Sequence, residues 1–174
     1  ILKNDLADIV YDPLTKQEAA PEKGFTTMHV GNLSLIALVA QSNPLAAHEK
    51  LPLSAFKSSE IIHFEGIYIS LSWHYIQEAC ERHGFSPQTR SRHFSNTAEM
   101  LTQCANLGSS VLIVGKNFAN RIPAGIKPFC TAIQIEDPDV LIPFYFLYKE
   151  SNENPLLQHL VNLIRSPQWE PLAL

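Results

Sequence analysis

The side chains best suited to chemistry are three cysteines and seven histidines, and their spacing favours neither a metal site nor a thiol centre. Cys80, Cys104 and Cys130 form no CxxC pair, which argues against a zinc ribbon and against a disulfide framework. Cys80 and His83 lie three residues apart on an expected helix, a spacing that could hold a metal. A free cysteine that shares a face with Ile76 is more often an apolar core residue. We therefore predict no metal and no cofactor.

Serine and glycine patterns do not indicate a catalytic centre either. The chain has seven glycines and contains no GxSxG elbow, no GxxxxGK[ST] loop and no GxGxxG fingerprint. Gly108-Ser109-Ser110 could suggest a nucleophile turn, but its spacing indicates no partner base. We predict that the protein is not an enzyme. Because catalytic triads are assembled in space, turnover that is abolished in a Ser70→Ala, Thr97→Ala double variant would revive that alternative.

Composition indicates a folded, mildly acidic domain. The chain has 174 residues, 45% of them apolar, and a formal net charge of −4, which argues against a surface that grips nucleic-acid phosphates. Its longest nearly apolar run, Leu33–Ala40, is too short to span a bilayer. The lack of a disulfide framework favours a reducing, cytoplasmic location. The chain begins with Ile1 and shows no signal-peptide pattern, so we expect a fragment or an excised domain.

Strands and helices are expected to alternate, which predicts an α/β architecture with βαβ units. The expected strands are residues 7–11, 25–30, 33–40, 61–64, 89–94, 111–114, 131–135 and 141–148. The first of them is mostly apolar and fits a buried parallel position, and Gly31-Asn32 is expected to form a tight turn or a bulge. A last helix opens at Asn152 or Asn154, with an apolar stripe of Leu156, Leu157, Leu160, Val161 and Ile164, and the tail after Pro167 is expected to be irregular.

Two further helices have clear end signals. Ser70 or Ser72 can accept a hydrogen bond from a free N–H at the start of a helix that runs to about His83, and Gly84 is suited to end it. A second helix begins near Asn96 with a pattern similar to a capping box and ends at about residues 106–108. Each of these helices directly follows an expected strand.

Five short motifs in order give the chain a family resemblance. They are Leu2–Val10 ("L-x-x-G-x-L-D-hydrophobic", with Asp8 on the acidic position), Leu38–Ala46 ("L-V-x-x-x-H-P-L-A"), Leu51–Phe56 with Ile61-Ile62, Gly84–Pro87 ("G-F-x-P") and Cys104–Gly108 ("A-A-G-L-G"). Over residues 1–165 the chain resembles the effector-binding domain of LysR-type transcriptional regulators. It departs from the motifs where Asn4 or Asp5 replaces a glycine, Asn43 a histidine and Asn106 a glycine. Asparagine can adopt the left-handed conformation that such a glycine position needs.

The resemblance implies a two-lobed, type II periplasmic-binding-protein-like fold that is truncated at the start of its first lobe. Residues 1–50 and 140–174 would form the partial first lobe, which dimerises, and residues 51–139 the second. The family's first lobe has strands and helices before the element matched here, so the fragment is expected to be poorly soluble alone, to pair with another chain, or to belong to a longer one. The implied protein is a bacterial cytoplasmic regulator that forms dimers or tetramers. It binds DNA through a winged helix-turn-helix absent from this chain, and a contact with RNA polymerase is also expected.

The same resemblance implies that a small effector, often an anion or a metabolite, binds in the cleft between the lobes. In open α/β sheets, ligands gather outside the carboxyl ends of strands and near helix N-termini. The expected effector contacts are Phe64, Glu65 and Ser70 after one strand, Ser95, Asn96 and Thr97 after the next, and Tyr11 as the opposite wall.

Each of these residues also has a simpler interpretation. Ser70 and Asn96 could only cap their helices, and Tyr11 could be a buried core aromatic. A carboxylate at Glu65 would repel an anionic effector, so it indicates a cationic or neutral ligand, or else it faces solvent. Arg90 and Arg92 could reach an acid, although an exposed face is the favoured interpretation. At the level of the whole protein, the alternative is a solute-binding protein of similar fold with no DNA role. The upstream coding sequence separates the two, since it would hold either a helix-turn-helix or a signal peptide.

Overall fold

The chain forms two compact units. The computed structural model describes residues 2–14, 22–65, 70–93, 96–169 and 172–173. Unit 1 comprises Ile1–Leu33 and Pro143–Leu174, and unit 2 comprises Ser34–Ile142. The chain passes between them within strands β2 (Phe25–Ala40) and β8 (Leu141–Lys149). These boundaries differ from the expected lobe limits because the second half of β2 pairs with strands of unit 2 and so belongs to that unit.

The strands of unit 2 form a mixed sheet in which three neighbours are parallel. Its order is β5 (Gln88–His93), β4 (Glu60–Glu65), β6 (Val111–Gly115), β2, β7 (Cys130–Ile135) and β3 (Lys50–Leu51). β4 is parallel to both β5 and β6, whereas β2 is antiparallel to β6 and to β7. The carboxyl ends of β4, β5 and β6 therefore meet at one edge of the sheet.

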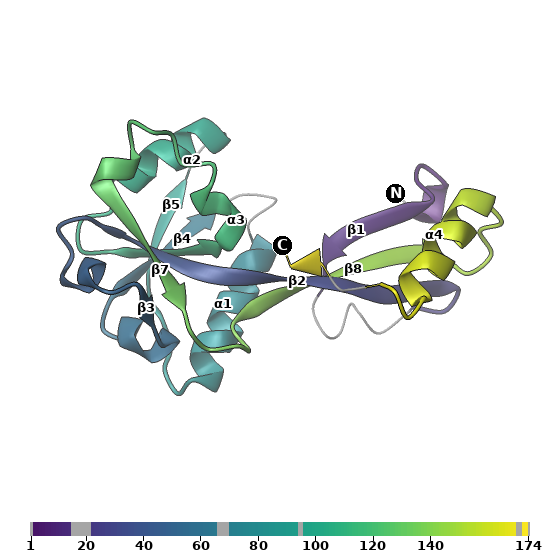
Figure 1. The fold of residues 1–174 in the computed structure, drawn as a ribbon, viewed down its shortest axis with the longest axis horizontal. Helices are drawn as coiled ribbons and strands as arrows, with labels where there is room; N and C mark the ends of the chain where they lie inside the picture. The colour runs from purple at the N-terminus through teal and green to yellow at the C-terminus, as the bar shows by residue number, and fades with distance from the viewer. Residues whose placement is uncertain (1, 15–21, 66–69, 94–95, 170–171, 174) are drawn as a thin grey trace. The chain divides into compact units, whose positions relative to one another are not determined.

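Helices cover both faces of this sheet, as Figure 1 shows for α1 (Ser70–Arg82) and α2 (Thr97–Gln103). Successive side chains of a strand point to opposite faces, so Ile62 and Phe64 pack toward α2 while His63 faces α1. One hydrophobic core of the unit lies on the α2 side. Its buried residues are Ile36, Leu38, Ala40, Ile62, Phe64, Met100, Cys104, Leu107, Leu112, Phe118, Ile122 and Cys130. Next to it lie α3 (Lys116–Ala119) and the short 3-10 helices Cys104–Asn106 and Lys127–Phe129. Unit 2 also contains the 3-10 helices Pro44–Ala47 and Leu53–Phe56.

The expected C-terminal end of α1 and the expected N-cap of α2 are confirmed. Gly84 has φ +80°, and its N–H donates to the carbonyl of Glu81 at 3.0 Å while the Phe85 N–H donates to that of Cys80 at 3.0 Å. This pair of bonds is the Schellman motif, which satisfies carbonyls that the end of a helix would leave unpaired. At the start of α2, Asn96 Oδ1 accepts from the Glu99 N–H at 2.9 Å, so Asn96 is the N-cap.

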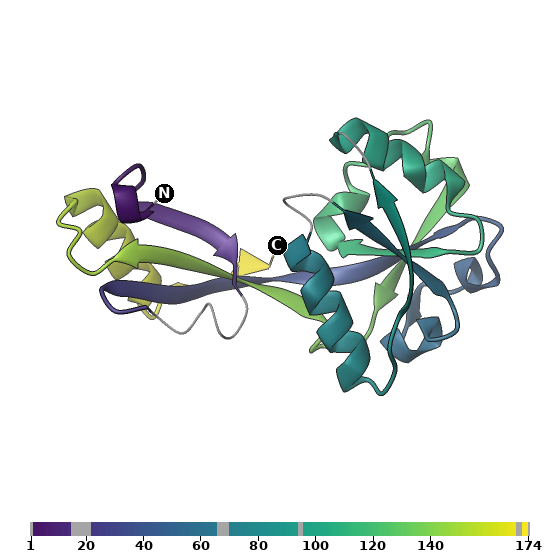
Figure 2. The same cartoon turned by 180° about the vertical axis from the view of Figure 1, so that it is seen from behind.

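The described part of unit 1 contains three longer strands and one α-helix. A 3-10 turn (Leu2–Asn4) precedes β1 (Ile9–Pro13), β1 pairs antiparallel with β8, and β8 neighbours β2. Helix α4 (Pro155–Arg165) lies on one side of these strands, which Figure 2 shows from behind. Leu157 and Val161 of α4 pack with Tyr148 of β8, so the apolar stripe of the helix faces the sheet.

Several expectations for unit 1 and β2 are wrong. β1 is antiparallel and only partly buried, because its partner β8 returns along it. Gly31-Asn32 forms no turn. β2 runs through these residues, and they pair in parallel with β9 (Leu172–Ala173), a strand in the tail that was expected to be irregular. Leu156 is 76% exposed because the helical period places Leu157, Val161 and Ile164 on the buried face instead. No helix among the described residues is long and apolar enough to cross a membrane.

Candidate functional site

The expected site maps onto the edge of the unit 2 sheet where β4 and β5 end. Glu65 and His93 are the last residues of the two parallel strands, and they are direct neighbours in the register. The chain then enters α1 at Ser70 and α2 at Thr97. This edge therefore combines strand ends with helix starts. The N–H groups in the first turn of a helix lack partners within the helix, so they are available to a ligand. That is the arrangement in which open α/β sheets hold ligands.

Glu65 has a partner that the sequence analysis missed. Its Oε2 lies 2.7 Å from His93 Nε2, and the two side chains are 40% and 80% exposed. A charged imidazole in this position would offset the carboxylate's repulsion of an anion, whereas a neutral one would leave it in place. The register of the two strands is the signal that could have found His93, because residues that end adjacent parallel strands lie side by side.

A second missed pair lies on the same side of the sheet. His63 precedes Glu65 by two residues, so both side chains point toward the α1 side. The His63 imidazole stacks on the Trp73 indole with ring centroids 4.5 Å apart and an interplanar angle of 26°. Trp73 belongs to the first turns of α1, so the start of the helix is held against the end of β4. The α1 side of the edge is therefore polar and aromatic.

The other expected contacts in unit 2 contribute in different ways. Phe64 is 3% exposed and belongs to the core on the α2 side, so its ring holds β4 against α2. Asn96 is exposed, and its Oδ1 is used as the cap of α2. The backbones of Ser70 and Thr97 occupy the first positions of α1 and α2. Ser95 lies outside the described residues.

Tyr11, the expected contact from the first lobe, lies in β1 of unit 1. It is 43% exposed and stacks on Phe144 at 4.9 Å, with Phe146 at 5.5 Å in an edge contact. Partial burial raises the pKa of the Tyr11 phenol above its ordinary value. The alternative of a buried core residue is therefore wrong, and Tyr11 is a half-exposed member of an aromatic cluster.

The two arginines of β5 do not lie on the side of the Glu65–His93 pair. Arg92 Nη1 donates to Gln103 Oε1 at 2.9 Å, and its Nη2 donates to the Asn106 carbonyl at 3.3 Å. Arg92 thus holds the end of α2 and the turn after it, and it is half-buried rather than exposed as expected. Arg90 Nη1 lies 3.5 Å from Glu60 Oε2 at the beginning of β4.

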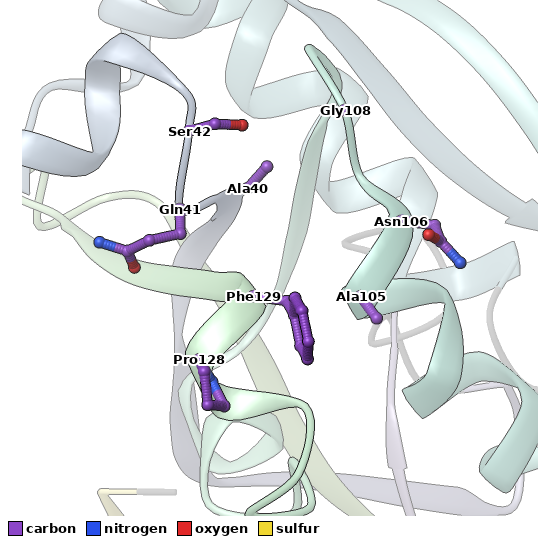
Figure 3. A pocket seen from close by; sticks show the side chains of 8 residues that line it. All are labelled: Ala40, Gln41, Ser42, Ala105, Asn106, Gly108, Pro128 and Phe129. Atoms are coloured by element: carbon purple, nitrogen blue, oxygen red, sulfur yellow. The ribbon is translucent and has the colours of Figure 1, made fainter.

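A pocket of about 450 Å³ lies at a different place in unit 2 and contains none of the expected effector contacts (Figure 3). It is lined by Ala40, Gln41, Ser42, Ala105, Asn106, Gly108, Pro128 and Phe129. Most of these residues lie at the end of β2 and just before β6, so the pocket is near the amino end of β6 rather than its carboxyl end. Two of the sequence motifs, residues 38–46 and 104–108, therefore line this pocket rather than the expected site.

The environments of the buried cysteines and of Ser110 indicate structural roles for these residues. Burial raises the pKa of the Cys80 thiol to about 11 and that of Cys104 to about 12. The buried Ser110 hydroxyl donates to Glu60 Oε2 at 2.8 Å, which satisfies it. Among the described residues, no group of three or more His, Cys, Asp or Glu side chains could hold a metal ion.

Comparisons with known proteins found a matching family and several solved structures with a similar fold. The family described as LysR substrate binding domain matches residues 2–167. The solved LysR family transcriptional regulator CbnR has a TM-score of 0.73 at 16% identity, over 94% of this chain and 53% of that chain. Full-length OxyR C199D from Pseudomonas aeruginosa has a TM-score of 0.71 at 14% identity, over 94% and 54%. The BenM effector binding domain with its effector benzoate has a TM-score of 0.71 at 15% identity, over 97% and 77%.

No curated protein sequence matches this chain. The chain spans about half the length of the full-length regulators that it resembles. At these identities the solved structures show the fold, which is the type II periplasmic-binding-protein-like fold, as the motifs implied. The match over residues 2–167, joined to this fold, shows that the chain belongs to the LysR substrate-binding domain family.

Proposed function

We propose that this chain is the effector-sensing domain of a LysR-type transcriptional regulator and that it binds a small metabolite without turning it over. The observation that carries the proposal is the edge of unit 2, where two parallel strands of a LysR substrate-binding domain end in Glu65 and His93 beside the starts of α1 and α2. The proposed contacts are Glu65, Ser70, Ser95, Asn96 and Thr97, with His93 added from the structure. Tyr11 in unit 1 and the position of the ligand between the two lobes stay predictions, and Phe64 acts through packing.

The rest of the regulator's function is part of the same proposal. We infer a cytoplasmic protein that forms dimers or tetramers, binds DNA through a winged helix-turn-helix outside this chain, and contacts RNA polymerase. A net charge of −4 is consistent with a domain that does not itself read DNA. An upstream coding sequence with a helix-turn-helix would support this role, and a signal peptide there would support a solute-binding protein.

Glu65 is the residue that bears on the charge of the effector. Its carboxylate opposes an anion and favours a cation or an uncharged ligand, whereas the helix starts favour a carboxylate. Glu65→Gln therefore decides the class: affinity for an anionic effector rises if Glu65 opposes it, and affinity for a cationic effector falls.

A thermal-shift screen of small carboxylates, amines and uncharged metabolites tests the proposal, with calorimetry on each hit. Ser70→Ala is expected to weaken an anionic hit about tenfold or more, since a hydrogen bond to a charged group contributes roughly 1.5–3 kcal/mol. Ser58→Ala, at an exposed serine in the turn before β4, is the matched control and should leave affinity unchanged. Unchanged affinity in Ser70→Ala with the fold intact would reject the role of Ser70. A hit whose affinity responds to none of the proposed contacts would reject the site.

A further inference from the structure

The C-terminal end of α1 is joined by charge to the loop that precedes β8. We call this cluster of Arg82, His83, Asp137 and Asp139 the α1 latch. Asp139 Oδ2 accepts from Arg82 Nε at 3.2 Å, and its Oδ1 lies 3.2 Å from His83 Nε2. Arg82 Nη2 also donates to the backbone carbonyl of Asp139 at 3.0 Å. On the other side of the imidazole, His83 Nδ1 lies 3.8 Å from Asp137 Oδ1.

The loop held by the latch also bonds to the beginnings of other elements. The second oxygen of Asp137, Oδ2, accepts from the Leu53 N–H at 2.6 Å. The Asp137 carbonyl accepts from the Val140 N–H at 3.1 Å, and the Val140 carbonyl accepts from the Leu35 N–H at 3.4 Å. Val140 is 4% exposed, so this part of the loop is firmly enclosed. The loop therefore joins α1, the 3-10 helix at Leu53 and β2.

Leu35 and Val140 lie close to the points where the chain crosses between the two units. The chain passes from unit 1 to unit 2 after Leu33 and returns after Ile142. The Leu35–Val140 hydrogen bond thus joins β2 to the residue just before β8, next to the points where these two crossing strands leave unit 2. The latch lies directly before β8, since Asp139 is two residues from Leu141.

We propose that the α1 latch couples α1 to the Leu35–Val140 contact, where β2 and β8 leave unit 2. A displacement of α1 would then move this contact with it. A helix of 13 residues transmits displacement along its axis because its backbone bonds resist bending. Its first turn carries Trp73, next to the proposed effector site, and its last turn carries Arg82. The use of the latch in signalling rests on the proposed function, but the mechanical connection itself does not.

Hydrogen exchange measured by NMR on the ligand-free protein tests this connection. Asp139→Asn removes the charge that both Arg82 and His83 face, and Arg82→Gln removes one partner while the His83 contact stays. We expect the amides of Val140 and Leu35 to exchange about fivefold faster in each variant. In the Asp139→Asn, Arg82→Gln double variant, the increase in exchange should be smaller than the two single effects combined, because both changes break one connection. Glu81→Gln, which alters a separate pair on α1 with Gln77, is the control and should leave both amides unchanged.

The pattern of exchange decides the outcome. Faster exchange confined to the last turn of α1, with Val140 and Leu35 unchanged, would overturn the proposal. If Asp139→Asn does not fold, Arg82→Gln with its control supplies the same comparison. Once the screen yields a ligand, Asp139→Asn should keep the ligand's affinity and lose its effect on exchange at Val140. A screen without hits would count against the proposed effector site and leave the ligand-free result on the latch intact.

Discussion

Replacement of Gly84 by alanine should destabilise unit 2 by an amount that the backbone alone sets. Gly84 has φ +80°, and a Cβ built there meets no atom within 4 Å. The cost is therefore conformational and not steric: alanine pays about 1–2 kcal/mol in the left-handed region. Alanine also restricts the unfolded chain, which returns about 0.4–1 kcal/mol. The net loss of unfolding free energy should therefore be about 0.8 kcal/mol at the middle of both ranges, and below about 1.6 kcal/mol.

Gly125 supplies the matched control for this substitution. A Cβ at Gly125 also meets nothing within 4 Å, and Gly125 is not among the glycines with positive φ. Gly125→Ala should therefore keep only the gain from the unfolded chain, about 0.4–1 kcal/mol of added stability. Gly84→Asn should lose less than Gly84→Ala because asparagine tolerates the left-handed conformation.

Urea denaturation followed by circular dichroism measures these differences. Gly84→Ala and Gly125→Ala should differ by about 1–2 kcal/mol, and each 1 kcal/mol corresponds to about 2–4 °C in melting temperature for a chain of this size. If the two alanine variants are equally stable, or if Gly84→Asn is the worst of the three, the left-handed helix end does not control stability and the reasoning fails.

Four further predictions concern caps and titrating groups. Asn96→Ala should cost about 1 kcal/mol through loss of the bond to the first turn of α2, and Asn96→Asp should keep most of it; equal losses in denaturation would contradict the cap. The thiols of Cys80 and Cys104, whose pKa values burial raises to about 11 and about 12, should resist alkylation at pH 8 until the protein unfolds. Because those pKa values are raised on folding, stability should fall as the pH rises above about 9, and Cys80→Ala should reduce that slope. Burial acts to raise the pKa of Asp139, but hydrogen bonds from the latch outweigh this effect and the pKa is lowered. The stabilisation that Asp139 supplies should therefore hold above about pH 4 and be lost in acid. An Asp139→Asn variant whose stability falls in acid as steeply as that of the wild type would refute this.

Local signals along the chain predicted much of unit 2. A helix end at Gly84 and a cap at Asn96 depend on the residue itself and its nearest neighbours, so both were predictable and both are confirmed. Strands β4 and β6 were expected from short apolar runs, and β5 from the alternating character of residues 89–94. The motifs named the family and its fold, and the family match agrees with them.

Other local signals were misleading because long-range pairing outweighed them. Gly31-Asn32 is typical of a turn, yet β9 pairs with these residues and keeps β2 extended. β1 has the composition of a buried strand, but an antiparallel neighbour on one side leaves Tyr11 43% exposed. No pattern within the strand itself contains its direction or its partner, since both depend on residues more than 130 positions away.

For this protein, the sequence by itself determined the helix ends, the expected strands and the family, because each rests on neighbouring residues or on short ordered motifs. The tertiary structure alone decided which side chains meet. It paired Glu65 with His93 and stacked His63 on Trp73 at the proposed site. It also joined Arg82 to Asp139 at the far end of α1, 57 residues along the chain. Such contacts follow from strand register and helix packing, which the whole chain sets by burying its core.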